Sequence, residues 1–148
     1  MLADVLQRHA WRCLAFCQLT THYHLVVETT LPDLAVGIKR LNQCYAQSFN
    51  RRHRRKGHLF ESRYSSIVIA DQAQLSTTLG YVHLNPARAG ICSDPADWEW
   101  CSFAQTVCRG GRGVVPTRRA LELIAPTPPQ AARRLSEHVY ERLTVDKT

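Results

Sequence analysis

The sequence predicts an α+β protein in which helices pack on an antiparallel sheet. Two observations support this class. Residues 11–19 and 22–28 are rich in apolar, aromatic and β-branched side chains, and only the short turn Thr20-Thr21 separates them, which is typical of an antiparallel hairpin. After residue 33, and again after residue 71, apolar residues recur every three or four positions, which is the period of a helix with one buried face.

The remaining elements follow from the same patterns. Asp71 with Gln74 has the spacing of a capping box and predicts the start of a helix, with Leu75, Leu79 and Val82 on its buried side. In chain order we expect a helix end at 2–9, the two strands, and a helix from about 32 to the basic residues after 50. An extended segment at 58–69 with a buried β-branched end should follow, and then the helix after 71. Short helices are expected at 117–125 and 129–143.

Composition bounds the function. The chain has 148 residues, 45% of them hydrophobic and 21% charged, as in ordinary globular proteins. The net charge is +7, and residues 1–90 carry 11 basic and 5 acidic side chains, which favours a polyanionic partner. No apolar run approaches the ~20 residues that span a bilayer. The six cysteines lack Cys-x-x-Cys spacing and no secretory signal is recognisable, so we expect reduced thiols in the cytoplasm.

His22 and His24 form a candidate metal site. Side chains on a strand alternate between faces, so both imidazoles point the same way, roughly 6.6 Å apart along the strand. Two imidazoles on one face can share a divalent ion, and Mn²⁺ accepts imidazole more readily than Mg²⁺ does. A His-x-His pair also occurs on ordinary solvated strands. Glu28 shares the face but lies roughly 13 Å from His22, too far for a third ligand.

Tyr81 is the candidate nucleophile. It lies with Gln74 on the polar face of the helix after Asp71, and Asn85 joins that face if the helix continues past Pro86. A tyrosine oxygen can attack a phosphodiester and conserve the bond energy as a phosphotyrosine. The alternative is an ordinary half-buried tyrosine.

A basic loop follows the helix that contains Phe49. Within six positions it holds five cations, a density at a helix end that suits phosphate contacts. The alternative is a solvated charge run. The five residues are Arg51, Arg52, Arg54, Arg55 and Lys56.

Several runs, in one unbroken order over roughly residues 10–103, resemble the REP-associated branch of the single-tyrosine HUH transposases. The first is His22-Tyr23-His24, which has the His–hydrophobic–His form of that family. The others are Leu41-Asn42-Gln43, Phe49-Asn50-Arg51-Arg52-His53, residues 57–64 (GHLFESRY) and residues 81–90 (YVHLNPARAG).

The resemblance implies a ferredoxin-like HUH fold and an enzyme that nicks single-stranded DNA beside hairpins through a 5′-phosphotyrosine. By position, His22 and His24 are metal ligands for Mg²⁺ or Mn²⁺, Tyr81 is the nucleophile, and Asn85 is a third ligand. Arg63, in the 57–64 run, joins the predicted DNA-binding set. Residues 1–105 would form the catalytic and DNA-binding domain and 106–148 a C-terminal helical extension. We expect single-stranded or hairpin DNA as partner, no membrane association, and a bacterial cytoplasmic, nucleoid-associated location, with monomer and dimer both open.

The chain departs from the family pattern in two places. Family members begin with a further strand and loop, and nothing like it precedes Met1, so we expect a central strand to be missing. Leu19-Thr20-Thr21 also replaces the family's Met-Pro-Asn. Three hypotheses therefore compete: a strand-cleaving enzyme, favoured by the His pair with Tyr81; a non-catalytic DNA-binding remnant, favoured by the absent strand; and, more distantly, a metal-dependent binder with another role.

Overall fold

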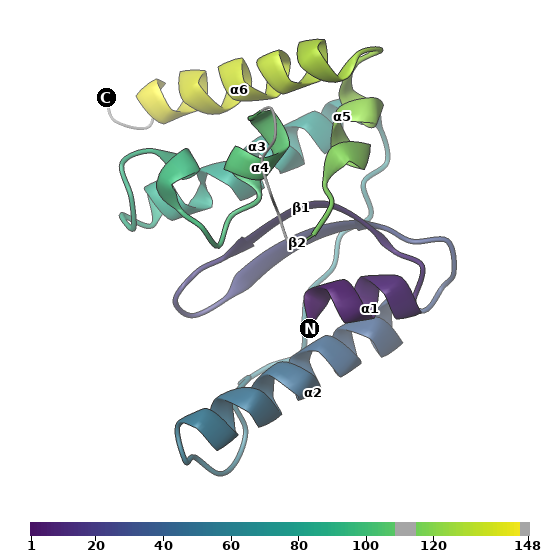
Figure 1. The fold of residues 1–148 in the computed structure, drawn as a ribbon, viewed down its shortest axis with the longest axis vertical. Helices are drawn as coiled ribbons and strands as arrows, with labels where there is room; N and C mark the ends of the chain where they lie inside the picture. The colour runs from purple at the N-terminus through teal and green to yellow at the C-terminus, as the bar shows by residue number, and fades with distance from the viewer. Residues whose placement is uncertain (109–114, 146–148) are drawn as a thin grey trace. The chain divides into compact units, whose positions relative to one another are not determined.

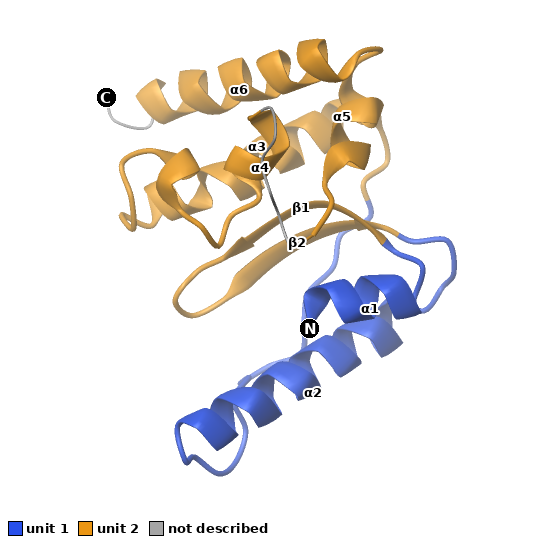
Figure 2. Ribbon diagram, in the orientation of Figure 1, with its two compact units in different colours: residues 1–11, 29–68 blue, residues 12–28, 69–148 orange. Residues whose placement is uncertain are grey.

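A computed structural model describes residues 1–108 and 115–145, and confirms the α+β class (Figure 1). By packing, the chain divides into two compact units, residues 1–11 with 29–68 and residues 12–28 with 69–148 (Figure 2). The elements are α1 (Leu2–Arg8), β1 (Arg12–Gln18), β2 (Tyr23–Glu28), α2 (Leu34–Arg52), α3 (Gln72–Arg88), the 3₁₀ turn η1 (Pro95–Asp97), α4 (Phe103–Val107), α5 (Arg118–Ile124) and α6 (Pro128–Val145).

The predicted hairpin is confirmed. Strands β1 and β2 pair antiparallel, with Cys17 opposite His24. The amide of Leu19 donates to the carbonyl of His22 over 2.8 Å, which closes the two-residue turn Thr20-Thr21. This register positions the His pair, because a slip of one residue would turn every side chain of β2 to the other face.

Helices of the second unit cover the hairpin in layers. Helix α3 packs on β1, and α6 packs on both α3 and α5, so that α3 to α5 lie between α6 and the strands in Figure 1. The core between them includes Ala15, Leu79, Leu84, Phe103 and Val139, all fully buried. The short helix α4 was not predicted from the sequence.

Helix α3 begins and ends as its sequence requires. The Asp71 carboxylate accepts from the amide of Gln74 (2.7 Å), and the Gln74 side chain accepts from the amide of Ala70 (2.7 Å), which confirms the predicted cap. The helix continues through Pro86 to Arg88. Proline cannot donate a backbone hydrogen bond, so the helix lacks the bond that residue 86 would give to the carbonyl of Val82. The side-chain amide of Asn85 donates to the carbonyl of Tyr81 over 2.7 Å. Tyr81 and Asn85 therefore belong to one helix.

The first unit is built on α1 and α2. Its core contains Val5, Trp11 and Ile38, and the Trp11 ring lies so close to Gly37 that a Cβ there would be 2.2 Å from it. The Trp11 indole donates to Asp33, the N-cap residue directly before α2, over 2.9 Å. These contacts fix the start of the helix that carries the basic loop at its other end.

The predicted burial at the end of the 58–69 segment is wrong. Ile67 and Val68 are 83% and 86% exposed, and only Ile69 packs against the core of the second unit. In the residues that the structure describes, the sheet consists of β1 and β2, so this β-branched run has no strand partner. The ferredoxin-like arrangement therefore stays a prediction.

The predicted domain boundary and the predicted absence of a membrane-spanning segment can be compared with the structure. The division by packing follows different boundaries from the predicted functional boundary at residue 105, which stays a prediction; part of the 106–148 extension lies outside the described residues. Across the described ranges, none of the helices has the length and apolar character needed to cross a membrane.

Candidate active site

The two histidines lie together at the start of β2. His22 directly precedes the strand, His24 is its second residue, and their ring centroids are 5.1 Å apart at 83°. The spacing of two residues on extended backbone produces this, as predicted. Zn²⁺ lies about 2.0–2.1 Å from an imidazole nitrogen that binds it, and on this scale two rings at such a separation can reach one divalent ion.

Tyr81 completes a row of three rings. Its ring centroid lies 5.4 Å from that of His24, edge to face at 84°, and the side chain is 43% exposed. Helix α3 brings it there because it packs on both strands of the hairpin. The structure thus places the predicted nucleophile beside the predicted metal ligands, within one packed unit.

The protonation of His24 suits a cation. Burial, and then the neighbouring His22, lower the pKa of His24, so its ring is neutral at neutral pH. Its Nε2 is buried and lacks a hydrogen-bond partner among the described residues. Nδ1 of His22 shares a hydrogen bond with the Thr21 hydroxyl (3.1 Å), which orients that ring. Buried polar atoms are normally satisfied, so the orphaned His24 nitrogen fits a metal ligand.

The structure gives less support for Asn85 as a metal ligand than for the two histidines. Its side chain is 7% exposed, and its amide nitrogen is held by the Tyr81 carbonyl one turn earlier. Within the described ranges, no three His, Cys, Asp or Glu side chains gather as a metal-binding group. A third protein ligand would therefore have to be another residue type, such as the Asn85 amide oxygen, and that role stays a prediction.

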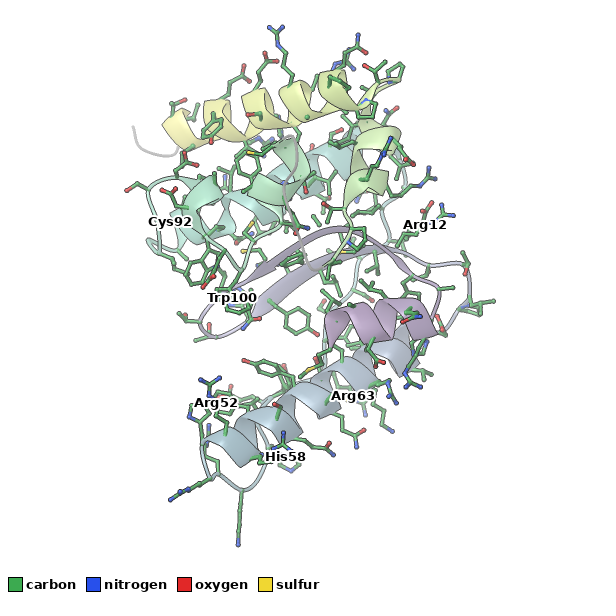
Figure 3. All side chains as sticks on the ribbon, in the orientation of Figure 1. Arg12, Arg52, His58, Arg63, Cys92 and Trp100 are labelled. Atoms are coloured by element: carbon green, nitrogen blue, oxygen red, sulfur yellow. The ribbon has the colours of Figure 1, made fainter. Side chains whose placement is uncertain are left out.

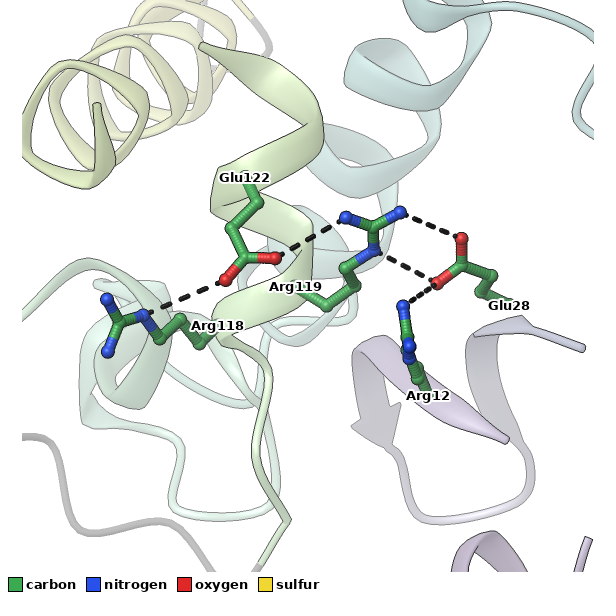
Figure 4. Close-up of polar contacts among 5 residues, drawn as sticks. All are labelled: Arg12, Glu28, Arg118, Arg119 and Glu122. Carbon is green, nitrogen blue, oxygen red and sulfur yellow. Dashed lines mark hydrogen bonds and ion pairs between the residues drawn. The ribbon is translucent and has the colours of Figure 1, made fainter. Parts of the chain in front are cut away.

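The carboxylate of Glu28 accepts hydrogen bonds from two arginines. Arg119 donates to both of its carboxylate oxygens at 3.0 and 3.1 Å, and Arg12 approaches at 3.5 Å (Figure 4). The Arg119 guanidinium holds the pKa of Glu28 below its usual value. Arg119 also contacts Glu122 on its own helix (3.4 Å). This network joins α5 to β2 and leaves Glu28 with a structural role.

Two residues near Tyr81 were missed by sequence reasoning. His83 is fully buried, its Nε2 lies 3.0 Å from the Ser102 hydroxyl, and burial lowers its pKa to about 3. Because Ser102 also bonds the backbone of Phe16 on β1 (2.9 Å), His83 ties α3 to the hairpin. Arg88 places its guanidinium 5.8 Å from the centroid of the Tyr81 ring. Its separation of seven residues from Tyr81, two helical turns, was the available signal.

The basic loop lies in the first unit, and hydrogen bonds of Asn50 hold its two ends together. The Asn50 side chain donates to the carbonyl of Gly57 (2.9 Å), and the Asn50 carbonyl accepts from the amide of Arg55 (2.9 Å). Gly57 has a φ of +91°, a conformation that favours glycine. Figure 3 labels Arg52 and His58 where the chain turns back after α2. All five predicted loop cations are exposed, as is Arg63 in the same unit.

Comparison with known proteins bears on the family resemblance and not on the His pair or the tyrosine of this chain. No protein-family profile matches it, and no solved structure matches it. It is 25% identical over 112 residues to the Haemophilus influenzae protein named "Putative REP-associated tyrosine transposase". The match covers 68% of this chain and spans 64% of the length of that relative. This is a distant similarity to one named transposase.

Proposed function

We propose that this protein cleaves and rejoins single-stranded DNA beside hairpins through a covalent 5′-phosphotyrosine at Tyr81. One observation carries the proposal: the half-exposed Tyr81 ring lies 5.4 Å from His24, which lies 5.1 Å from His22. The named function of the Haemophilus influenzae relative supports DNA as the substrate class.

The reaction exchanges one phosphodiester for another. The Tyr81 oxygen attacks the phosphorus, a bond from tyrosine to phosphorus forms, and the bond from phosphorus to the 3′ oxygen breaks. The phenol proton is lost and the departing 3′ oxygen gains one. Because the new bond is again a phosphodiester, a free 3′ hydroxyl can later attack it and restore Tyr81.

His22 and His24 are proposed to hold Mg²⁺ or Mn²⁺, with the Asn85 amide oxygen as a third ligand. When bound, the ion would polarise a phosphate oxygen as a Lewis acid. The chain's own contribution is orientation. Thr21 fixes the ring of His22, and the packing of α3 on β1 holds Tyr81 against His24.

The basic loop is proposed to bind the DNA backbone. Arg51 and Arg52 lie in the last turn of α2, and the other three cations follow on a loop closed by Asn50; all five are exposed. The backbone that carries them therefore needs little ordering before the side chains contact phosphates. Arg63 is proposed as a further contact. Counterion release from the DNA would supply much of the affinity and make it depend on salt.

A non-catalytic DNA-binding protein is the second candidate. One observation favours it. The loop cations belong to a unit that does not contain His22, His24 or Tyr81, so phosphate binding does not depend on these three side chains. Such a protein would bind hairpin DNA with the same salt dependence and would form no covalent adduct.

The deciding experiment is adduct formation on a hairpin oligonucleotide with Mn²⁺ or Mg²⁺. The enzyme should form a denaturant-resistant adduct that Tyr81→Phe abolishes while binding is retained. The matched control is Tyr64→Phe, since Tyr64 is 38% exposed and lies in the other unit. Tight binding without an adduct, over several hairpins, would favour the second candidate.

A further inference from the structure

We propose that Arg88 binds the non-bridging oxygens of the phosphate that Tyr81 attacks. This inference rests on the proposed function, because it concerns the same reacting phosphate. It assigns a catalytic contact to a residue that sequence reasoning did not select.

The geometry places Arg88 beside the nucleophile. Arg88 follows Tyr81 by seven residues on α3, so the two side chains share one side of the helix. Long helical side chains lean toward the helix N-terminus, and the Arg88 guanidinium accordingly lies 5.8 Å from the centroid of the Tyr81 ring. Both side chains are exposed, so a DNA strand can reach them.

A phosphate that reacts with Tyr81 must come within reach of this guanidinium. The phosphorus has to approach the tyrosine oxygen to roughly 3–3.5 Å. Its non-bridging oxygens then lie near a cation that already contacts the same ring. Guanidinium is weakly hydrated and its planar donors match two phosphate oxygens. Negative charge grows on these oxygens during attack, so a fixed cation stabilises the transition state.

Two other roles would also place an arginine here. Arg88 lies in the last turn of α3, where a cation interacts well with the helix dipole. It also makes a cation–π contact that could orient the Tyr81 ring without touching DNA. Neither role depends on the charge of the DNA linkage, and the phosphate contact does.

The test therefore neutralises a single linkage. Two oligonucleotides are compared, one with an ordinary phosphodiester and one with a methylphosphonate at the position that the wild-type protein joins to Tyr81. Binding is measured in the Tyr81→Phe background without metal, so that neither cleavage nor an ion contributes. Arg88→Ala should weaken binding of the phosphodiester by roughly tenfold, the size of one charge-assisted hydrogen bond. It should leave binding of the methylphosphonate unchanged.

Adduct rates supply the second readout. Arg88→Ala with an intact Tyr81 should slow the reaction of the phosphodiester by about 10²–10³-fold, as the loss of a transition-state donor does. Arg88→Lys should recover part of the rate because it restores the charge without the planar donors. The control Arg142→Ala removes a cation from the last turn of α6 and should change neither readout.

The outcomes separate the claims. An adduct from the wild type, with equal binding losses on both oligonucleotides for Arg88→Ala, would overturn the phosphate contact alone and leave a positioning role. No adduct from the wild type on any hairpin would overturn the proposed function and this inference with it.

Discussion

The ring of Tyr81 meets the ring of His24 edge to face, with 5.4 Å between the centroids, although Tyr81 follows His24 by 57 positions in the sequence. Nothing local in the sequence brings them together. Their contact depends on α3 packing on the hairpin, and the tie between His83 and Ser102 is part of that packing. Catalysis by Tyr81 would therefore require α3 to stay packed on the hairpin.

Loss of a histidine should weaken metal binding independently of catalysis. His24→Ala removes the imidazole whose Nε2 is buried without a partner in the described residues, and we expect Mn²⁺ affinity to fall by at least about tenfold. Titration calorimetry without DNA measures this directly. His58→Ala, which changes an exposed histidine of the other unit, should have no effect. Equal affinity in both variants would show that the His pair is not the metal site.

The basic loop should set the salt dependence of DNA binding. Each phosphate contact on single-stranded DNA contributes about 0.7 to the slope of log affinity against log salt. Arg51→Ala with Arg55→Ala should therefore flatten the slope by about 1–2 units, measured by fluorescence anisotropy. The control pair, Arg133→Ala with Arg134→Ala, removes two exposed cations from α6. An unchanged slope for the loop variant would identify the loop as a solvated charge run.

His83 should make the protein sensitive to acid. Its pKa is about 3 in the folded protein and about 6.5 when unfolded, so between these values the unfolded chain binds the extra proton. Its contribution to stability is thus complete above pH 6.5 and declines below it. Urea unfolding at pH 7.5 and 5.0 should show a loss of about 2 kcal/mol that is due to this residue.

The variant His83→Gln isolates that loss. Glutamine can still bond Ser102 but does not titrate, so the fall in unfolding free energy between the two pH values should be smaller by about 2 kcal/mol than in the wild type. His58→Gln should retain the full wild-type fall. Identical pH dependence for His83→Gln and the wild type would contradict the burial of a neutral imidazole.

Gly80 should be intolerant of alanine because α6 lies against it. A Cβ at Gly80 would be 2.5 Å from Cδ2 of His138. Gly→Ala within a helix normally stabilises by up to about 1 kcal/mol, but here the overlap should destabilise by about 1–3 kcal/mol. Adding His138→Ala should recover most of the loss, measured by urea unfolding. No recovery in the double variant would mean that His138 is not the obstacle.

Local features were predictable and tertiary ones only in part. The hairpin, the shared face of the histidines and the Asp71 cap follow from alternation, turn chemistry and capping, all of which act over a few residues. Burial at Ile67 and Val68 was predicted wrongly, because it depends on a strand partner that the segment itself does not specify.

In the candidate site, too, the contacts between distant segments were the hardest to predict from the sequence. The contact of Tyr81 with His24 was expected only through the family resemblance, since periodicity places Tyr81 on a polar face without naming what lies opposite. His83 was hidden because a buried histidine in an apolar helix gives no pattern, and its partner Ser102 comes from a distant loop.

The most direct test of the central claim is to identify the residue joined to DNA. A hairpin oligonucleotide labelled at its 3′ end is incubated with the protein and Mn²⁺, and the adduct is digested and sequenced by mass spectrometry. The tryptic peptide 64–88 contains both Tyr64 and Tyr81, so fragment ions and the two phenylalanine variants must distinguish them. We predict that the label stays on the peptide through Tyr81, and that a 5′ label is released as free DNA. An adduct at another residue, or one that persists in Tyr81→Phe, would contradict the account.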